Sequence, residues 1–505
     1  MRLSPKGFDP GAAHTDSRHA ARLVQILVSG GDRRIQLDAA GRNQYHASAA
    51  PSDALAYGSS TISSISDHAF AALLRRWRGR FDRPMSAGAY ARGLDAIRAG
   101  LARYFGTDDR TAIIFAASGT DLEYVALAAA CDGRPLTAIL LGRDEVGSGC
   151  AHSAAGRFFA EETALGARVV VQTAIDPAFA GTELIDVPVR DEAGFPRASA
   201  MVAEELSRHV EHAAAAGRRA IVHVVHGSKS GLTLPALAEV ERLVAAHGDA
   251  MRVVVDACQL RITPEGVRRY LDLGCIVMLT GSKFAGGPPF SGFALVPPTI
   301  RADAKALPPG LRRISYRAEW PSDWPGADRL DAQGNFGLLL RLEAALVEIE
   351  RFAAVPADRV AAVSARFCEQ LVNMAERLGV AEVPGAGGVS CLATQTLQTI
   401  DLSARWRDCD FDAARTLHAY IAQHARRDTG REIRLGQPVR THRLPDGRSA
   451  GTLRLSLSMP LISDLADLSP AALDARLAND MVLIEQAIAT AADVTLDRKA
   501  PVALA

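Results

Sequence analysis

Between residues 111 and 279, short apolar runs alternate with longer stretches in which apolar residues recur every three or four positions. The runs have the length of buried strands, and the longer stretches have the period of helices. A chain that alternates in this way folds into a mainly parallel sheet covered by helices on both faces. We therefore predict an α/β fold. Strands are expected at residues 111–115, 137–141, 168–172, 220–225, 252–255 and 276–279, and helices at 121–130, 200–216 and 234–246.

The chain of 505 residues is too long for a single core, so we predict three segments. They are an N-terminal arm (1–85), a large domain that carries the sheet (86–335) and a smaller α+β C-terminal domain (336–505). In the arm, the hydroxyl-rich stretch 57–66 is either an ordered loop that lines a site or a flexible surface segment. Beyond the sheet, helices are expected at 89–105, 336–352, 356–378 and 411–424, and strands at 394–402 and 452–458.

Composition excludes several classes of partner. The 57 basic and 57 acidic residues cancel, so no net field attracts nucleic acid or an anionic membrane. The seven cysteines are scattered without a CxxC pair, which predicts neither a disulfide framework nor a metal site. No run approaches the roughly 18 apolar residues of a membrane span, and the first residues lack the apolar core of a secretory signal. We expect a reduced, cytoplasmic protein.

One carboxylate and one amine stand out as candidate catalytic groups. Asp256 ends the apolar run 252–255, and Lys283 follows the run 276–279 in a turn of small residues. Only five of the 57 basic residues are lysines, and arginine cannot act as an amine nucleophile. A lysine amine forms a Schiff base with the aldehyde of pyridoxal phosphate (PLP), and an aspartate keeps the ring nitrogen of PLP protonated. The alternative is a solvated turn lysine.

Two further segments fit the same cofactor. Ser118, Gly119 and Thr120 lie between the strand 111–115 and the helix 121–130, where backbone N–H groups and the helix dipole can bind a phosphate. The alternative is an ordinary helix cap. Ser228 follows the strand 220–225, and ligands of open α/β sheets bind at such strand ends. We expect its hydroxyl to bond a cofactor substituent.

Four short motifs follow one another along the chain: Ser118-Gly119-Thr120, Asp256-Ala257-Cys258-Gln259, Thr280-Gly281-Ser282-Lys283 and Leu453-Arg454-Leu455. In order and spacing they resemble the class-V aminotransferase group of fold-type-I PLP enzymes, which includes cysteine desulfurases, kynureninases and aminotransferases. The resemblance runs from about residue 85 to 465. It implies a PLP-dependent transferase fold of type I, with a large domain built on a mostly parallel sheet and a small α+β domain.

The resemblance also implies a role for each motif residue. Lys283 would bind the cofactor and move the substrate α-proton, and Asp256 would pair with the pyridine nitrogen. Gln259 would bond the phenolic oxygen of the ring, and Arg454 would bind the substrate carboxylate. The residues that would hold the phosphate are Gly119, Thr120, Thr280 and Ser282. Relatives are homodimers with sites near the interface, so a homodimer is expected.

The chain departs from the group at several positions. Relatives often carry a histidine after an acidic residue to stack on the ring, but Val146 follows Glu145 here, and His152 is the remaining candidate. Many relatives have Asn at the position of Ser228, and desulfurases usually have His at the position of Ser282. A desulfurase also needs a reactive cysteine. Cys391 is the nearest candidate, although its apolar neighbours also suit a buried structural thiol.

These features indicate a PLP enzyme that acts on an amino acid or amine, and an aminotransferase is the first hypothesis. A cysteine desulfurase or another PLP-dependent lyase is the second. Two hypotheses from other classes stay open: a catalytically inactive PLP-fold protein that serves as a binding or scaffold subunit, and an α/β protein with a different cofactor.

Overall fold

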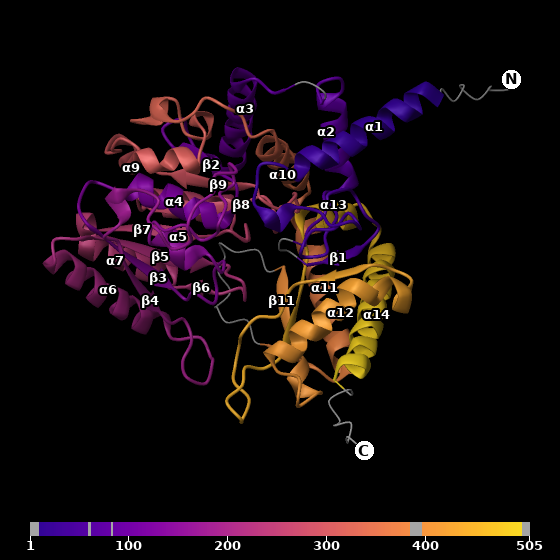
Figure 1. Cartoon of the computed structure of the whole chain (residues 1–505). Helices are drawn as coiled ribbons and strands as arrows, with labels where there is room; N and C mark the ends of the chain where they lie inside the picture. Colours follow the sequence, from indigo (N-terminus) through magenta and orange to yellow (C-terminus); the bar gives the residue numbers. More distant parts are fainter. Residues whose placement is uncertain (1–9, 59–61, 82–83, 384–395, 497–505) are drawn as a thin grey trace, which may run out of the picture.

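The computed structural model describes residues 10–58, 62–81, 84–383 and 396–496. Its centre is an eight-stranded sheet, in which β6 (Thr233–Leu234) pairs only with β5. The other seven strands lie in the following order across the sheet (Figure 1): β2 (Ala112–Ala116), β9 (Gly292–Val296), β8 (Ile276–Thr280), β7 (Met251–Asp256), β5 (Arg219–His226), β3 (Leu136–Leu141) and β4 (Glu183–Val187).

The sheet is mostly parallel, as predicted. The pairs β3–β4, β3–β5, β5–β7 and β7–β8 are parallel, whereas β9 runs antiparallel to both of its neighbours. The carboxyl ends of β5, β7 and β8 therefore lie side by side at the same end of the sheet. Asp256 lies at this end, and the loops that follow the strands there carry Ser228 and Lys283.

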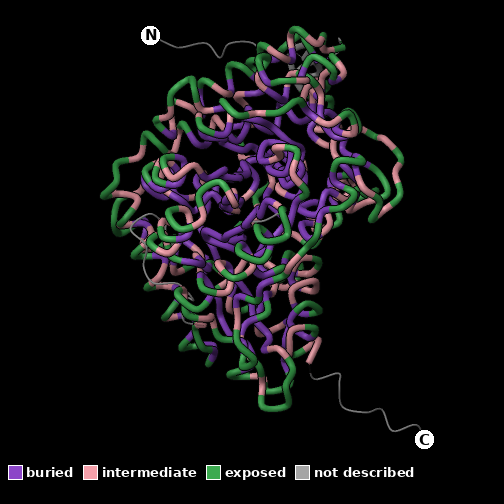
Figure 2. The backbone as a smooth tube through the Cα atoms, turned by 90° about the vertical axis from the view of Figure 1, so that its left-hand side faces the viewer, coloured by how far each residue is buried: buried purple, intermediate pink, exposed green. Residues whose placement is uncertain are grey.

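Both faces of the central part of the sheet are covered, which explains why most of its inner strands are rich in apolar residues. Ile221 and Val254 pack with α4 (Gly119–Ala130) on one face. On the other face, Val222 and Val255 belong to the same core as α6 (Ser199–Ala215), α7 (Leu237–His247) and α8 (Pro264–Asp272). Figure 2 shows the resulting buried backbone at the centre of the molecule, with the exposed segments around it.

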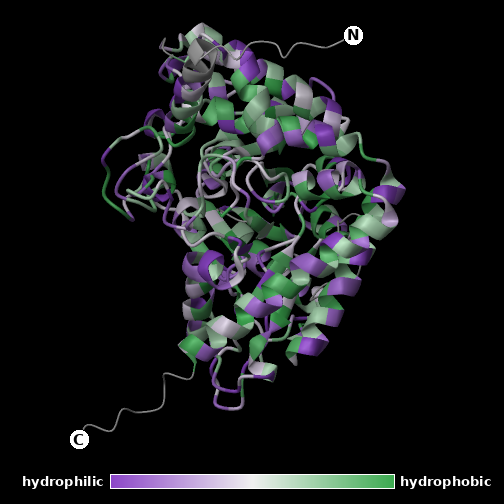
Figure 3. Cartoon of the chain, turned by 90° about the vertical axis from the view of Figure 1, so that its right-hand side faces the viewer, coloured by the Kyte–Doolittle hydropathy of each residue, from purple (hydrophilic) through white to green (hydrophobic). Residues whose placement is uncertain are grey.

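The C-terminal part combines a small antiparallel sheet with several helices. This sheet has the order β10 (Ala381–Glu382), β11 (Leu397–Asp401), β13 (Thr452–Ser456). Its helices show hydrophilic and hydrophobic residues side by side, as expected when one face of each helix lies on a core (Figure 3). They are α10 (Phe336–Ala353), α11 (Ala357–Leu378), α12 (Phe411–Thr429), α13 (Met459–Ala466) and α14 (Pro470–Thr495).

The N-terminal segment contacts both parts. It contains α1 (Pro10–Leu27), β1 (Leu55–Tyr57) and α2 (Asp67–Trp77), and α3 (Ala87–Phe105) follows. β1 pairs in parallel with β12 (Ile433–Leu435) of the C-terminal part. In the stretch 57–66, the described residues Ile62 and Ile65 are buried, which favours the ordered alternative over a flexible surface segment. None of the helices in the described segments has the length and apolar character needed to cross a membrane.

One predicted strand is wrong. Residues 168–172 form no strand, and Val170 in the middle of this run is 69% exposed. The run lies in a loop held by isolated bridges such as Glu162 with Arg168. The edge strand of the sheet is instead β4, whose sequence Glu-Leu-Ile-Asp-Val mixes charged and apolar residues because most of it is solvent-exposed. The strand β9 and the helix α1 were not predicted.

Arg341 of α10 fastens the N-terminal segment to the large domain. Its fully buried guanidinium donates hydrogen bonds to four backbone oxygens, those of Phe290 (2.8 Å), Leu27 (2.9 Å), Ser29 (2.6 Å) and Gly30 (2.9 Å). Phe290 lines the cavity described below. Arg341 therefore fixes the segment that leads into the site.

We expect Arg341→Met to lower the free energy of unfolding by about 3 kcal/mol, because four buried carbonyl groups lose their donor. Urea unfolding followed by circular dichroism measures this. Arg366→Met is the matched control: Arg366 is half-exposed and pairs with Glu369 (2.6 Å), so its loss should cost less than about 1 kcal/mol. Equal losses in the two variants would contradict the role of Arg341.

A buried carboxyl group makes stability depend on pH. Glu319 accepts hydrogen bonds from the Tyr90 hydroxyl (2.9 Å) and the Tyr316 N–H (2.9 Å), and burial raises its pKa to about 7. Between the ordinary glutamate pKa of about 4.3 and this value, the folded chain binds more protons than the unfolded chain. This contribution to stability is therefore complete at low pH and is lost as the pH rises towards 7.

Glu319→Gln removes the titrating group and should cancel this loss. Relative to the unchanged protein, the variant should gain on the order of 2 kcal/mol in unfolding free energy between pH 4.5 and pH 8. Urea unfolding at the two pH values measures the gain. A stability difference that is the same at both pH values would show that Glu319 does not titrate in this window.

Candidate active site

A cavity of about 480 Å³ opens at the end of the large sheet where the carboxyl ends of β5, β7 and β8 lie. Its volume lies in the range of small-molecule and cofactor sites. The cavity brings together all ten residues that the sequence predicts for the site: Ser118, Gly119, Thr120, Ser228, Asp256, Gln259, Thr280, Ser282, Lys283 and Arg454. Their individual roles stay predictions, and the local geometry bears on each of them.

Asp256 and Lys283 lie at the ends of two neighbouring parallel strands. Asp256 is the last residue of β7, and its Oδ1 accepts a hydrogen bond from the N–H of Cys258 (2.9 Å). Lys283 follows three residues after β8 ends. Because β7 and β8 are paired in parallel, the carboxylate and the amine reach the same cavity. The bond from the Cys258 N–H helps to fix the orientation of the carboxylate at the cavity.

The amino end of α4 lies against this pair. Ser118 is the N-cap of α4, and its hydroxyl accepts from the Asp121 N–H (3.2 Å). A side chain at Gly119 would place its Cβ 3.1 Å from Cys258 Sγ and 3.3 Å from Thr280 Cγ2. Glycine therefore allows the helix end to approach β7 and β8 closely. The N–H groups at the start of a helix are suited to bind an anion, and Ser118 acts both as the N-cap and as part of the cavity wall.

The hydroxyl groups around the helix end differ in what they can still donate. Thr120 Oγ1 accepts from the Cys150 thiol (3.9 Å), so its proton is free. Thr280 donates to the carbonyl of Cys258 (2.7 Å), which uses its proton. Ser282 makes only a long contact with Thr280 Oγ1 (3.5 Å). Thr120 and Ser282 are therefore better placed than Thr280 to donate side-chain hydrogen bonds to a phosphate.

Gln259 is oriented by its neighbour. It is buried, and its side-chain oxygen accepts from the Arg261 guanidinium (3.4 Å). This leaves the amide NH₂ group of Gln259 as a donor towards the cavity. A donor at this place fits the predicted bond to the phenolic oxygen of PLP.

Ser228 belongs to a network around Glu145. Its hydroxyl donates to Glu145 Oε2 (2.6 Å), and Ser230 donates to the same carboxylate (2.7 Å). Arg190 completes the network with an ion pair to Glu145 (2.9 Å). Burial alone would raise the pKa of Glu145, but Arg190 and the two hydroxyls hold it below its usual value. The proton of Ser228 is therefore used, and only acceptance of a hydrogen bond remains possible at its oxygen.

Arg454 reaches the cavity from the small domain. It lies in β13 and donates to the carbonyl groups of Gln437 (2.7 Å) and Lys229 (2.7 Å). Among the described residues, no carboxylate lies within ion-pair distance of its guanidinium, although the side chain is buried. A buried cation without a counterion is suited to bind a substrate carboxylate, the role that the resemblance implies.

The thiols of the cavity are poor nucleophiles. Burial, together with nearby carboxylates, raises the pKa of both Cys150 and Cys258 well above the usual value, so neither forms a thiolate readily. Cys391, the candidate cysteine of a desulfurase, lies outside the described residues.

The candidate ring-stacking residue His152 lies elsewhere. It lines an adjoining cavity of about 500 Å³, which shares Arg34, Tyr45 and Ser148 with the first. His152 does not line the cavity of Lys283. Val146, the residue after Glu145, does line it.

Several cavity residues were not assigned to the site from the sequence. The N-terminal segment contributes Arg34 and Tyr45, and the small domain contributes His418 and Gln437. Arg34 pairs with Asp32 (2.6 Å) and stacks on the ring of Phe290. No local sequence motif predicts this contact with Phe290. Lys229 carried a signal, because it is one of only five lysines and follows a strand end.

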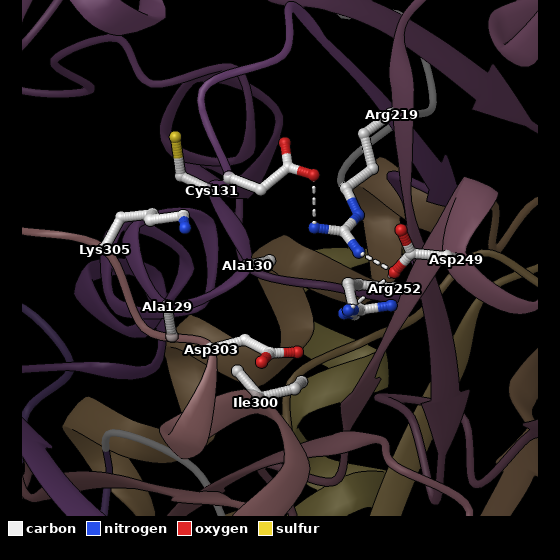
Figure 4. A pocket seen from close by; sticks show the side chains of 10 residues that line it. Ala129, Ala130, Cys131, Arg219, Asp249, Arg252, Ile300, Asp303 and Lys305 are labelled. Carbon is white, nitrogen blue, oxygen red and sulfur yellow. Dashed lines mark hydrogen bonds and ion pairs between the residues drawn. The ribbon is translucent and has the colours of Figure 1, made fainter.

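A second pocket of about 170 Å³ lies near the amino ends of β5 and β7 (Figure 4). There Arg219, the first residue of β5, donates to Asp132 (2.7 Å) and Asp249 (2.6 Å). Its charge is thus compensated within the protein, and the pocket contains none of the predicted residues. Among the described residues, no cluster of His, Cys, Asp and Glu has the arrangement of a metal site.

The comparisons with known proteins bear on the fold. No family model matches the sequence. No curated protein matches it either. Solved structures do match: the apo cysteine desulfurase of Thermococcus onnurineus NA1 is 14% identical, with a TM-score of 0.52 over 86% of this chain and 95% of that chain.

Two other matches have the same architecture. The pyridoxamine-pyruvate aminotransferase of Mesorhizobium loti is 17% identical, with a TM-score of 0.50 over 89% of this chain and 98% of that chain. A mutant of the lyase C-DES, which holds glycine linked covalently to its PLP cofactor, is 18% identical, with a TM-score of 0.51 over 84% and 96% of the two chains. The chain therefore has the fold of the fold-type-I PLP-dependent enzymes, and the predicted fold class is confirmed.

Proposed function

We propose that this protein is a PLP-dependent aminotransferase that binds its cofactor through Lys283 and acts on an amino acid. The observation that carries the proposal is the convergence of Lys283, Asp256 and Arg454 on one cavity of cofactor size. An amine, a carboxylate and a buried cation in one cavity provide a covalent anchor, a partner for the ring nitrogen and a carboxylate clamp.

The residues of the cavity fit PLP. The N–H groups of Gly119 and Thr120, with the hydroxyls of Thr120 and Ser282, would hold the phosphate. Asp256 would hold the proton on the ring nitrogen, and Gln259 would donate to the phenolic oxygen. Val146 would cover the ring in place of the usual histidine. When bound, PLP stabilises negative charge on the reacting carbon of the substrate.

The protein itself positions the substrate and moves its proton. Arg454 would bind the carboxylate next to the reacting carbon, and Lys283 would remove the proton from that carbon and deliver it to the former aldehyde carbon of the cofactor. The cavity is lined by residues from the N-terminal segment, the large domain and the small domain. We further propose a cytoplasmic homodimer, and sedimentation of the purified protein tests the dimer.

Product analysis tests the reaction. The PLP-loaded protein is incubated with each common amino acid, with and without a panel of 2-oxo acids, and the products are identified by mass spectrometry. Amino-group transfer should occur only when a 2-oxo acid is present. Release of sulfide or alanine from cysteine without a 2-oxo acid would instead identify a desulfurase or lyase.

A further inference from the structure

The cavity contains a second amine, that of Lys229. β7, which carries Asp256, lies between β5 and β8. Lys229 follows three residues after β5 ends, as Lys283 follows three residues after β8 ends. Two of the five lysines of the chain therefore line the same cavity, on opposite sides of Asp256.

Lys229 has no counterion within the described residues. The hydrogen bond of its Nζ goes to the backbone carbonyl of Asp144 at 3.5 Å, which is long. Glu145, the residue after Asp144, already pairs with Arg190 at 2.9 Å. Burial and the neighbouring cations Lys283 and Arg454 lower the pKa of Lys229, as expected for a cation that lacks an anion.

Arg454 lies beside Lys229 and is held by it. Its Nη1 donates to the Lys229 carbonyl (2.7 Å), and its other hydrogen bond also goes to a carbonyl group. The cavity thus carries two adjacent cations that form no ion pair with a described carboxylate, and Glu145, whose charge acts on both of them, is already paired with Arg190. Arg454 is buried and Lys229 is partly buried, so leaving both without an ion pair is costly, and the pair favours a ligand that brings the missing anions.

Apart from Lys283, which the proposed function assigns to the cofactor, the other basic groups of the cavity are paired or neutral. Arg34 pairs with Asp32 (2.6 Å), and Arg415 contacts Asp412 (3.4 Å). Burial lowers the pKa of His418 to about 4, so it is neutral at physiological pH. The phosphate-type site at α4 follows β2, on the β8 side of Asp256, whereas Lys229 follows β5 on the other side. Lys229 is therefore not needed for the cofactor phosphate.

We propose that Lys229 and Arg454 together select substrates with two anionic groups, of the class of amino dicarboxylic acids and their 2-oxo counterparts. Arg454 binds the carboxylate next to the reacting carbon, and Lys229 binds the distal carboxylate. This assignment rests on the proposed function and adds its substrate class.

Binding of unreactive acids tests the proposal without turnover. Calorimetric titration compares glutarate with butyrate, on the protein with and without PLP. The unchanged protein should bind glutarate at least about ten-fold more tightly than butyrate, as expected for one additional charged hydrogen bond. Lys229→Gln should abolish this preference and leave butyrate binding unchanged, and Lys229→Arg should retain most of it.

Lys305→Gln is the matched control, because this exposed lysine lines the separate pocket of Figure 4. It should keep the glutarate preference. The proposal is overturned if the unchanged protein shows no preference, or if Lys229→Gln weakens glutarate and butyrate binding equally. Thermal unfolding of each variant shows whether it is folded, and Lys229→Arg decides the question if the Gln variant is not.

Turnover separates this proposal from the proposed function. With PLP bound, Lys229→Gln should lower kcat/KM for glutamate or aspartate about ten-fold or more, with little change for alanine. A protein that binds no PLP would contradict the proposed function, while its glutarate preference would still support the cation pair. An active enzyme that prefers monocarboxylic amino acids would contradict the cation pair alone.

Discussion

Lys283→Ala is expected to abolish catalysis, with a loss of at least about 10³-fold in kcat at saturating substrate. Lysine is both the covalent anchor of the cofactor and the group that moves the substrate proton, and general acid–base catalysis alone contributes about 10²–10⁴-fold. Lys283→Arg should be equally inactive, because a guanidinium stays protonated and cannot bond the cofactor. The rate of product formation, measured with excess PLP, checks both variants.

The controls separate chemistry from folding. Lys305→Ala removes an exposed lysine and should keep full activity. Lys283 makes no hydrogen bond or ion pair that would be lost among the described residues, so thermal unfolding of Lys283→Ala without cofactor should match that of the unchanged protein. If the kcat of Lys283→Ala stays within ten-fold of that of the unchanged protein, another amine must bind the cofactor and move the proton. Lys229 would then be the candidate, because it lines the same cavity.

Asp256→Asn is expected to lower kcat about 10²–10³-fold, the range found when one preorganised electrostatic contact to developing charge is removed. A neutral amide cannot hold a proton on the ring nitrogen as a carboxylate can. The substitution should preserve the fold, because the amide oxygen can still accept from the Cys258 N–H, the 2.9 Å bond that Asp256 makes. The loss should therefore appear in kcat, with thermal stability nearly unchanged.

Asp256→Glu, compared with Asp256→Asn, tests whether the negative charge at this position is what matters. It keeps the charge but lengthens the side chain, so it should retain more activity than Asp256→Asn if charge is the property that matters. Steady-state kinetics of both variants on the same substrate make the comparison. An Asn variant that works within a few-fold of the unchanged protein would show that Asp256 does not face a protonated ring nitrogen.

The residues proposed for catalysis could be predicted because they lie beside strong local sequence patterns. Continuous apolar runs predict strands that are buried on both faces, and the carboxyl ends of these strands locate Asp256 and Lys283. The rarity of lysine narrows the choice of amine further. Gly119 follows from the same logic, since a strand-to-helix turn beside a ligand needs a small residue.

Other features could not be inferred, because they depend on contacts between distant segments. β4 is an edge strand with a mixed sequence, whereas the more apolar run 168–172 lies exposed in a loop. Arg34 reaches the cavity from a segment whose preceding turn is bonded through backbone carbonyls to the distant Arg341. The bond from Ser228 to Glu145 spans 83 positions of sequence. No periodicity or short motif encodes such pairings.

The central claim is that the amine of Lys283 holds PLP covalently, and one measurement tests it directly. The purified protein is loaded with PLP, reduced with borohydride, digested and mapped by mass spectrometry. A pyridoxyl group on Lys283 is the result that this account predicts. A pyridoxyl group on Lys229 instead, or on no lysine at all, would contradict it.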